Sequence, residues 1–391
     1  MPLPTTTQYF IMKYYVIAGE RSGDLHASNL MKAILENDPE ADFRFWGGDA
    51  MQQVGGTMIK HYQDTAFMGF MTVLKNLRKI RGFIKLCKKD ILEYQPDVVV
   101  LVDYAGFNLR IAKFAKQHNL STFFYISPKV WAWNTKRAYK IKAIIDRMFV
   151  IFPFEKGFYK KFDYEVDYVG NPLLDAIADF KPNADFRQKH DLDNRPIIAL
   201  LPGSRKQEVE KLLPVMVDST EAFPNHQFVI AGVNNLPDAL YEVAQNKPQV
   251  KIIYENTYDL LTQAEAAIVT SGTATLETGL FKIPQVVVYK TSPLTYSIAK
   301  RLIKTDYISL VNLVAGKEVV KELIQKECNA EMVARELKKL IDGGADRSKV
   351  LDDYDQLQQL MGETGASHRA GTLMVKYLNQ QNTNQDALLN Q

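Results

Sequence analysis

Short runs of consecutive apolar residues alternate along the chain with longer stretches in which apolar residues recur every three to four positions. A strand that is apolar on both faces must be covered on both faces, so this alternation predicts parallel sheets flanked by helices. Predicted helices include Leu25–Glu36, Lys206–Ala222 and Thr273–Phe281. The predicted strands form two series: Tyr14–Ala18, Val98–Val102, Thr122–Ile126 and Met148–Phe152, then Ile197–Leu201, Phe228–Ala231, Val250–Ile253, Ala267–Thr270 and Gln285–Tyr289.

A polar stretch with two prolines at its ends, Lys181–Arg195 followed by Pro196, separates the two series and is predicted to be an interdomain linker. The fold class is therefore α/β, with two doubly wound, Rossmann-like domains. We expect them to cover residues 12–175 and 176–360. Ligands of such sheets bind at the carboxyl ends of the strands, so the two domains are expected to face each other across a cleft.

After residue 318 the pattern becomes helical to about Leu378. The segment 361–378 is expected to form a helix that packs back on the first domain, or crosses to a partner chain, which leaves a homodimer open. The final residues, 379–391, are rich in Asn and Gln and are expected to be disordered.

Composition narrows the class of protein. A chain of 391 residues is long enough for two domains, and its net charge of +3 gives no argument for nucleic acid. The two cysteines, Cys87 and Cys328, have no metal-like spacing, which favours a reducing, cytoplasmic compartment. Residues 1–11 lack the features of a signal peptide, Met12 is a candidate natural start, and no apolar run is long enough to span a membrane.

The first predicted strand ends in Ala18-Gly19-Glu20-Arg21-Ser22-Gly23-Asp24. The glycines allow a sharp turn from strand to helix, and the exposed amides of a helix start suit an anionic group. We therefore take Ser22, Gly23 and Asp24 as a candidate anion-binding loop. The sequence is neither GxGxxG nor a P-loop, and an ordinary helix start capped by Ser22 or Asp24 is the alternative.

Asp103 follows the apolar strand Val98–Val102 directly, in the segment Val102-Asp103-Tyr104-Ala105-Gly106-Phe107-Asn108. A carboxylate at the carboxyl end of a parallel strand is well placed to act as a base on a ligand in the cleft. The alternative is an aspartate that caps the following helix.

The second domain offers two similar strand ends. Arg205 closes Leu201-Pro202-Gly203-Ser204-Arg205, where a guanidinium can bind a diphosphate, although a surface pair with Glu208 or Glu210 is the alternative. Ser271-Gly272-Thr273 leads into a helix whose N-terminal dipole suits a nucleotide diphosphate, and Glu277 one turn later could accept hydrogen bonds from ribose hydroxyls. An ordinary Ser/Thr-capped helix is the alternative here.

Between Thr65 and Lys89 there are seven basic residues and no acidic one, and apolar residues are interleaved with them. This pattern is typical of an interfacial helix that lies on anionic lipid or receives an acyl chain, and also of a core helix with a solvated basic face. Lys129-Val130-Trp131-Ala132-Trp133 suits a membrane interface or a lipid phosphate, or simply core packing. The candidate membrane and acyl contacts are Phe70, Met71, Val73, Leu74, Leu77 and Ile80.

Asp191-Leu192-Asp193 resembles the Asp-x-Asp metal site of some sugar-nucleotide transferases, but it falls in the predicted linker and we assign it to solvent. The six histidines show no ligand spacing. The sequence predicts no metal and no cofactor.

Taken together, the ordered segments resemble bacterial lipid-A-disaccharide synthase, an inverting glycosyltransferase family of the two-domain GT-B type. The resemblance extends from about Lys13 to about Leu378. The segments that carry it are AGERSGD (18–24), FMG (67–69), VDYAGFN (102–108), SPKVWAW (127–133), PFEKGFY (153–159), LPGSR (201–205), SGTATLE (271–277) and KRLIKTDYISLVNLVAG (300–316).

The resemblance implies transfer of 2,3-diacylglucosamine from UDP-2,3-diacylglucosamine to the 6-hydroxyl of 2,3-diacylglucosamine 1-phosphate, on the cytoplasmic face of the inner membrane. It implies Asp103 as general base and Glu20 as a second active-site carboxylate. It implies that Arg205, the Ser271–Thr273 turn, Glu277 and Asn312 hold UDP, and that Phe67–Arg81 contacts the membrane with its anionic lipid.

The chain departs from the common family pattern at His26, at Tyr104-Ala105-Gly106 and at Gly170-Asn171-Pro172. These departures bear on the acceptor or acyl pocket, while Asp103 is retained. The alternatives are a UDP-N-acetylglucosamine 2-epimerase, which has no use for a basic apolar helix, and another UDP-sugar transferase of the same fold.

Overall fold

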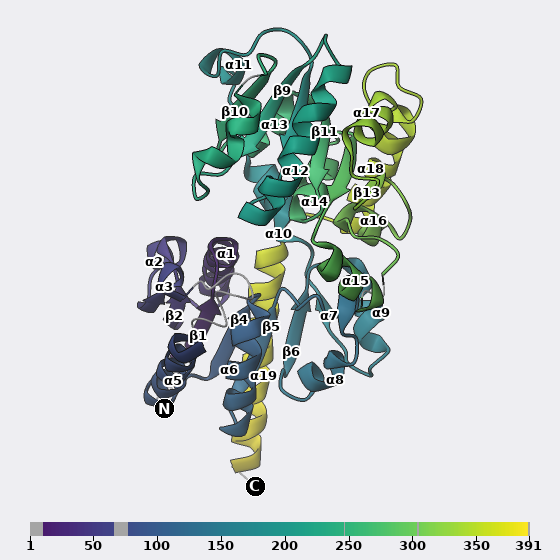
Figure 1. Ribbon diagram of the computed structural model, residues 1–391. Helices are drawn as coiled ribbons and strands as arrows, with labels where there is room; N and C mark the ends of the chain where they lie inside the picture. The colour runs from purple at the N-terminus through teal and green to yellow at the C-terminus, as the bar shows by residue number, and fades with distance from the viewer. Residues whose placement is uncertain (1–10, 66–76, 246, 303–304, 390–391) are drawn as a thin grey trace. The chain divides into compact units, whose positions relative to one another are not determined.

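The structure, a computed structural model, describes residues 11–65, 77–245, 247–302 and 305–389. The chain forms two compact units: unit 1 comprises the chain up to Pro172 together with the part from Thr364 onward, and unit 2 comprises Leu173–Glu363. Each unit is built on one parallel sheet (Figure 1). The first strand begins at Lys13, directly after Met12, and residues 1–10 lie outside the described part.

Unit 1 contains a seven-stranded parallel sheet in the order β3-β2-β1-β4-β5-β6-β7. Its strands are β1 (Lys13–Ala18), β2 (Asp42–Gly47), β3 (Thr57–His61), β4 (Val98–Val102), β5 (Ser121–Tyr125), β6 (Arg147–Val150) and β7 (Asp167–Tyr168). Its helices are α1 (Arg21–Asn37), α2 (Asp49–Val54), α3 (Tyr62–Thr65), α5 (Leu77–Tyr94), α6 (Ala105–Gln117), α7 (Val130–Trp133), α8 (Arg137–Lys142), α9 (Pro153–Lys160) and α19 (Ala366–Leu389).

Side chains of β1 alternate between the two faces of this sheet, as the strand geometry requires. Tyr14 and Val16 join the apolar cluster formed with α1 and α19, whereas Tyr15 and Ile17 join the cluster formed with α5 and α6. All four are at most 1% exposed, so burial on both faces explains why the strand is apolar throughout. The central strands place their carboxyl ends side by side at one edge of the sheet.

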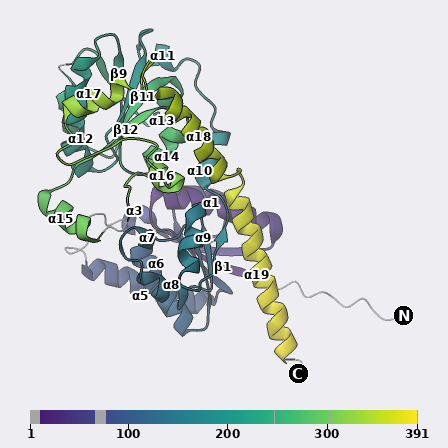
Figure 2. The ribbon, with the colours of Figure 1, turned by 90° about the vertical axis from the view of Figure 1, so that its right-hand side faces the viewer.

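Helix α19 belongs to unit 1 although it comes last in the chain, and it lies along α1 (Figure 2). Gly371 is the point of closest approach, because a Cβ there would lie 2.8 Å from backbone and side-chain atoms of Ala33. The helix continues to Leu389, so the tail expected to be disordered from residue 379 is helical. Asn and Gln do not break a helix that packing has already started, and Ser121 donates a 2.8 Å hydrogen bond to Gln381.

Unit 2 contains a six-stranded parallel sheet in the order β10-β9-β8-β11-β12-β13. Its strands are β8 (Ile197–Leu201), β9 (Gln227–Gly232), β10 (Val250–Tyr254), β11 (Ala264–Thr270), β12 (Gln285–Tyr289) and β13 (Glu322–Ile324). Its helices are α10 (Pro172–Asp179), α11 (Phe186–Lys189), α12 (Lys206–Ser219), α13 (Thr257–Gln263), α14 (Thr273–Leu280), α15 (Pro293–Leu302), α16 (Leu310–Ala315), α17 (Ala330–Lys338) and α18 (Arg347–Met361), with 3₁₀ turns at Thr220–Ala222 and Asp238–Ala244.

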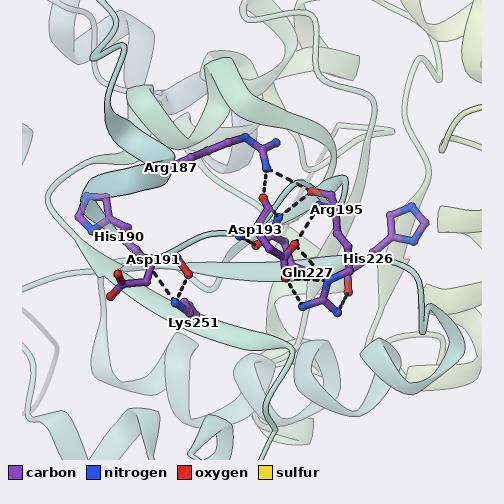
Figure 3. A network of polar contacts seen from close by, with 8 residues as sticks. All are labelled: Arg187, His190, Asp191, Asp193, Arg195, His226, Gln227 and Lys251. Carbon is purple, nitrogen blue, oxygen red and sulfur yellow. Dashed lines mark hydrogen bonds and ion pairs between the residues drawn. The ribbon is translucent and has the colours of Figure 1, made fainter.

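The stretch Lys181–Arg195, expected to be a linker, is instead part of unit 2. It forms α11, buries Phe186 in the core of the unit, and is tied to the starts of β9 and β10 by a network of polar contacts (Figure 3). Gln227 donates to the carbonyls of Asp193 and Arg195 at 2.8 and 2.6 Å. The polar residues of this stretch make hydrogen bonds within unit 2, several of them to backbone carbonyls. Sequence composition cannot distinguish such residues from residues that are exposed to solvent.

Candidate functional site

The turn that follows β4 has an unusual backbone. Asp103 and Tyr104 are consecutive residues in the left-handed region, with φ values of 46° and 45°. Residues other than glycine rarely adopt this conformation, and they keep it only where surrounding contacts fix the backbone. The Asp103 amide donates to the Tyr125 carbonyl at 2.9 Å, and the buried Asn108 side chain donates to the Asp103 carbonyl at 2.8 Å. The turn is thus held from both sides.

The Asp103 side chain is exposed at this edge of the sheet. Partial desolvation by the surrounding protein raises the pKa of its carboxyl above the usual range, and the positive charge of Lys129 and a hydrogen bond from the Tyr104 backbone oppose that rise. An accessible carboxylate with a raised pKa is a better proton acceptor than an ordinary surface aspartate.

The loop after β1 lies next to this turn, because β1 and β4 are neighbours and Ala18 pairs with Val102. A Cβ built on Gly19 would lie 2.2 Å from the Tyr104 ring, so the ring packs directly on this glycine. Glu20, which precedes the first turn of α1, is half-buried. Burial raises the pKa of the Tyr104 hydroxyl, and the negative charge of Glu20 adds to that rise. The structure therefore brings Glu20 and Asp103 to the same edge of unit 1.

Asp24, one of the three predicted anion-loop residues, has a structural partner. Its buried carboxylate accepts hydrogen bonds from the amides of Gly48, Ala50 and Met51 at 2.6, 3.0 and 3.3 Å, and so caps the start of α2. Gly23 is also buried, against Ala18. Of the three predicted residues, only Ser22 exposes its side chain to solvent.

In unit 2 the corresponding turn follows β11. Ser271 donates to the Ile308 carbonyl at 2.9 Å, which ties the turn to the segment before α16. Gly272 precedes α14 without capping it by a side chain, and Thr273 is exposed. The first amides of α14 therefore lack a side-chain partner, and the positive end of the helix dipole lies at this turn.

Two predicted UDP-binding residues flank that turn. Glu277 is half-buried and accepts a 3.2 Å hydrogen bond from Tyr258; burial raises the pKa of its carboxyl. Arg205 follows β8, the neighbour of β11, and pairs with Glu208 at 3.1 Å while its side chain remains 72% exposed. The surface pair considered from the sequence is present, and the guanidinium keeps most of its surface accessible.

Asn312, predicted to hold UDP, is fully buried and has no free hydrogen-bonding position. Its amide group donates to the Val320 carbonyl and to Glu322, both at 2.9 Å, and its oxygen accepts from the amides of Val319 and Val320 at 2.8 and 3.0 Å. Glu322 also accepts from Ser309, the residue that caps α16. Asn312 therefore organises the segment that Ser271 contacts.

The basic, apolar stretch is described only from α5 onward; Phe70, Met71, Val73 and Leu74 lie outside the described residues, as does the side chain of Leu77. Ile80 is partly buried. One side of α5 packs in the core through Cys87 and Ile91, while Arg78, Lys79, Arg81, Lys85 and Lys89 are exposed. Helix α5 thus combines a buried side with a strongly basic one. Among the described residues no helix is both long and apolar enough to cross a membrane.

The Asp191–Asp193 segment, assigned to solvent from the sequence, is only partly solvated. The Asp193 carboxylate is exposed but pairs with Arg195 at 2.8 Å, and the Asp191 carbonyl accepts from Lys251 (Figure 3). Within the part of the chain that the structure describes, no three His, Cys, Asp or Glu side chains gather as a metal site would require, and both cysteines are buried.

Sequence reasoning missed four residues at these edges: Tyr104, Asn108, Tyr258 and Glu322. The first two lie within the motif that contains Asp103, so their closeness to it along the chain was a usable signal. Tyr258 and Glu322 lie outside the predicted motifs, 19 and 10 positions along the chain from Glu277 and Asn312, so the motifs gave no signal for them.

The chain is similar in sequence to one family of known proteins over most of its length. Residues 14–375 match the model of the family described as lipid-A-disaccharide synthetase. Relatives named lipid-A-disaccharide synthase include one from Geobacter metallireducens, 36% identical with 93% of this chain and 96% of that one covered, and one from Syntrophus aciditrophicus, 39% identical with 92% and 96% covered.

Solved structures similar to the whole chain share only its fold. A UDP-GlcNAc 2-epimerase from Neisseria meningitidis bound to UDP-GlcNAc has a TM-score of 0.66 at 12% identity, covering 94% of this chain and 100% of that one. The glycotransferase of kitacinnamycin has a TM-score of 0.67 at 12% identity, with the same coverage. Sequence similarity over nearly the full length is what distinguishes among proteins of this GT-B-like fold, and by that measure this chain is an enzyme of the lipid-A-disaccharide synthase family of glycosyltransferases.

Proposed function

We propose that the protein transfers 2,3-diacylglucosamine from UDP-2,3-diacylglucosamine to the 6-hydroxyl of 2,3-diacylglucosamine 1-phosphate, forming the β(1→6) disaccharide 1-phosphate and UDP. The observation that carries this proposal is the accessible Asp103 carboxylate on a left-handed turn beside Glu20, in a chain that matches the family over residues 14–375.

Asp103 takes the proton of the acceptor 6-hydroxyl as that oxygen attacks the anomeric carbon of the donor from the face opposite UDP. The bond to the UDP oxygen breaks as the new glycosidic bond forms, which inverts the configuration. Partial desolvation makes the carboxylate more basic, and the contacts of Asn108 and Tyr125 fix the backbone that carries it. A positioned base contributes about 10²–10⁴ in rate. Glu20 is the second carboxylate of this edge and acts on the sugar hydroxyls.

The leaving diphosphate needs positive potential. The N-terminal amides of α14 and the exposed Arg205 guanidinium supply it in this proposal, without a metal ion. Glu277 accepts from the ribose hydroxyls. Asn312 contributes indirectly, since its side chain is saturated by internal hydrogen bonds and keeps the Ser309 segment in contact with Ser271.

The acylated substrates require access to a membrane, and the exposed basic side of α5 supports a peripheral location on the anionic, cytoplasmic face of the inner membrane. Replacing Lys79 and Lys85 by Gln should lower binding to vesicles that contain anionic lipid by about 10- to 30-fold, because each basic residue near such a surface contributes roughly 1 kcal/mol. The exposed Lys338 and Lys349 of unit 2 provide a matched control. Equal losses in both double variants would refute a specific role for α5.

The reaction is tested by UDP release from the purified protein in detergent and EDTA, with and without the acceptor. Release that requires the acceptor and survives EDTA supports the proposal. UDP release without acceptor dependence, or conversion of UDP-N-acetylglucosamine to its 2-epimer, would instead support an epimerase or another UDP-sugar enzyme.

A further inference from the structure

The segment that follows β5 is anchored by buried polar contacts. Ile126, at its start, is a β-branched residue in the left-handed region, with φ of 68°. Ser127 lies within 2.7 Å of the Tyr159 hydroxyl, and the buried Trp131 donates from its indole nitrogen to Glu155 at 3.2 Å. A strained residue held by several partners indicates a segment whose conformation is fixed rather than free.

Glu155 is the centre of these contacts. It is 1% exposed, and its second oxygen accepts from the amides of Ile151 and Phe152 at 3.2 and 3.0 Å. Burial raises the pKa of its carboxyl to about 7, and the hydrogen bonds oppose that rise. The proposed reaction makes no use of this buried carboxyl. The hydrogen bonds of Glu155 join the turn after β6 to the segment after β5.

Lys129 lies inside that segment, between Ser127 and Trp131, and its side chain is exposed. Strands β4 and β5 are neighbours, so the segment emerges beside the Asp103 turn, and the charge of Lys129 acts on the Asp103 carboxyl. No hydrogen bond or ion pair within the described residues occupies its ammonium group. An exposed cation beside the proposed base, on an anchored segment, is available for an anionic part of a ligand.

The proposed acceptor carries its reacting hydroxyl and its phosphate on one sugar ring. With the hydroxyl at Asp103, the phosphate must lie within the span of that ring. We propose that Lys129 binds the phosphate of the acceptor, and that Glu155, acting through Trp131, is the positioning residue that holds the Lys129 segment beside Asp103. This inference rests on the proposed function, because it takes the acceptor from it. An ammonium group is a common ligand for a phosphate, and a sugar phosphate carries nearly two negative charges at neutral pH.

The experiment compares wild type, Lys129→Met and Lys113→Met with two acceptors, one with the 1-phosphate and one without it. Lys113 is an exposed lysine of α6, whose charge does not act on Asp103, so it controls for loss of a positive charge. We expect Lys129→Met to raise KM for the phosphorylated acceptor about 10- to 100-fold, because the loss of a hydrogen bond to a charged group weakens binding by about that factor. The difference from wild type should vanish with the phosphate-free acceptor, and UDP affinity should not change.

An unchanged KM for the phosphorylated acceptor would overturn the inference. So would an equal loss on both acceptors, because Lys129 would then act only on the basicity of Asp103. These results require a wild-type protein with acceptor-dependent UDP release. Absence of that release would overturn the proposed function itself, and the two failures are therefore distinguishable.

The positioning role is tested by Glu155→Gln, which keeps the volume of the side chain but can present an N–H to the Trp131 indole instead of an acceptor. Trp131→Phe removes the same hydrogen bond by deleting the indole donor. This second variant keeps the test valid if Glu155→Gln fails to fold. Both should raise KM for the phosphorylated acceptor with little change in kcat, and neither should add to the effect of Lys129→Met. Additive losses in the double variants would show that Glu155 acts independently of Lys129.

Discussion

The turns after β4 and β11 occupy equivalent places, each at the end of an interior strand of a parallel sheet, yet they are built differently. The turn after β4 has two consecutive non-glycine residues in the left-handed region and an exposed carboxylate. The turn after β11 has none, because Gly272 is extended with φ of 165°, and its hydroxyls and amides face the start of a helix. The turn that carries the proposed base has a strained backbone. The turn proposed to hold the nucleotide has no such strain, because the backbone amides and the dipole of a helix start are sufficient to bind a diphosphate.

The most direct test of this difference is to remove the Asp103 carboxylate. Asp103→Ala and the isosteric Asp103→Asn should each lower kcat by about 10²–10⁴, because the proton acceptor is lost. Affinity for UDP, measured by calorimetry, should remain at the wild-type value, because the nucleotide is assigned to unit 2. Near-normal turnover in Asp103→Asn would remove Asp103 from its proposed role.

The complementary change is Arg205→Met. We expect UDP affinity to fall about 10- to 100-fold, the range for a hydrogen bond to a charged group, while stability changes little because the pair with Glu208 is exposed. The neighbouring Lys206, also exposed and paired with Glu210 at 3.5 Å, is the matched control. Calorimetric titration with UDP measures both variants. Equal losses in Arg205→Met and Lys206→Met would point to general charge rather than a specific contact.

Two glycines test the difference in packing. Alanine at Gly19 would place its Cβ 2.2 Å from the Tyr104 ring, whereas alanine at Gly272 would meet only the Thr270 carbonyl, at 4.0 Å. Gly19→Ala should therefore lower the free energy of unfolding by about 1–3 kcal/mol, and Gly272→Ala should change it by less than about 0.5 kcal/mol. Urea denaturation of the two variants gives the comparison directly, and matching values would mean that Tyr104 is free to move off Gly19.

The smallest expected effect is on the pH profile. Only ionised Asp103 can accept a proton, so kcat/KM should fall as pH drops through its pKa. Desolvation raises that pKa, so the acid limb should lie above the ordinary aspartate value of 3.8. Lys129 opposes the rise, so Lys129→Met should move the limb to still higher pH. A limb that moves to lower pH in this variant would show that the charge of Lys129 does not act on Asp103.

Interior strands and the residues that end them could be predicted from the sequence, because a strand buried on both faces leaves a continuous apolar run. Val98–Val102 and Ile197–Leu201 were predicted at their observed limits, and Asp103 at the end of the former. Strands β2, β3, β7 and β13 were missed. They lie at or near the margins of their sheets, where Asp42, Arg44 and similar residues interrupt the apolar pattern.

Side-chain partnerships could not be predicted, because the partners lie outside the motifs and only the fold brings them into contact. Asp24 is predicted from the sequence to be an accessible loop residue, but backbone amides more than twenty positions later donate hydrogen bonds to its carboxylate. Asn312 is predicted from the sequence to bind a ligand, but in the structure the nearby Val319–Glu322 segment fills all of its hydrogen-bonding positions. A motif gives the location of a residue within the fold, and the direction of its side chain depends on contacts that the motif does not contain.

The return of α19 to unit 1 also sets an order for synthesis. Helix α1 packs on α19 through Leu30, Met31 and Ile34, which share a core with Met374 and Leu378. All of unit 2 is translated between these helices, which takes about 10–40 s at about 5–20 residues per second. During that interval the part of α1 that packs on α19 lacks that partner, although the strands of unit 1 are already available to the rest of its apolar surface. Unit 1 therefore completes its core only after the last helix has been made, whereas every residue of unit 2 is translated before that helix.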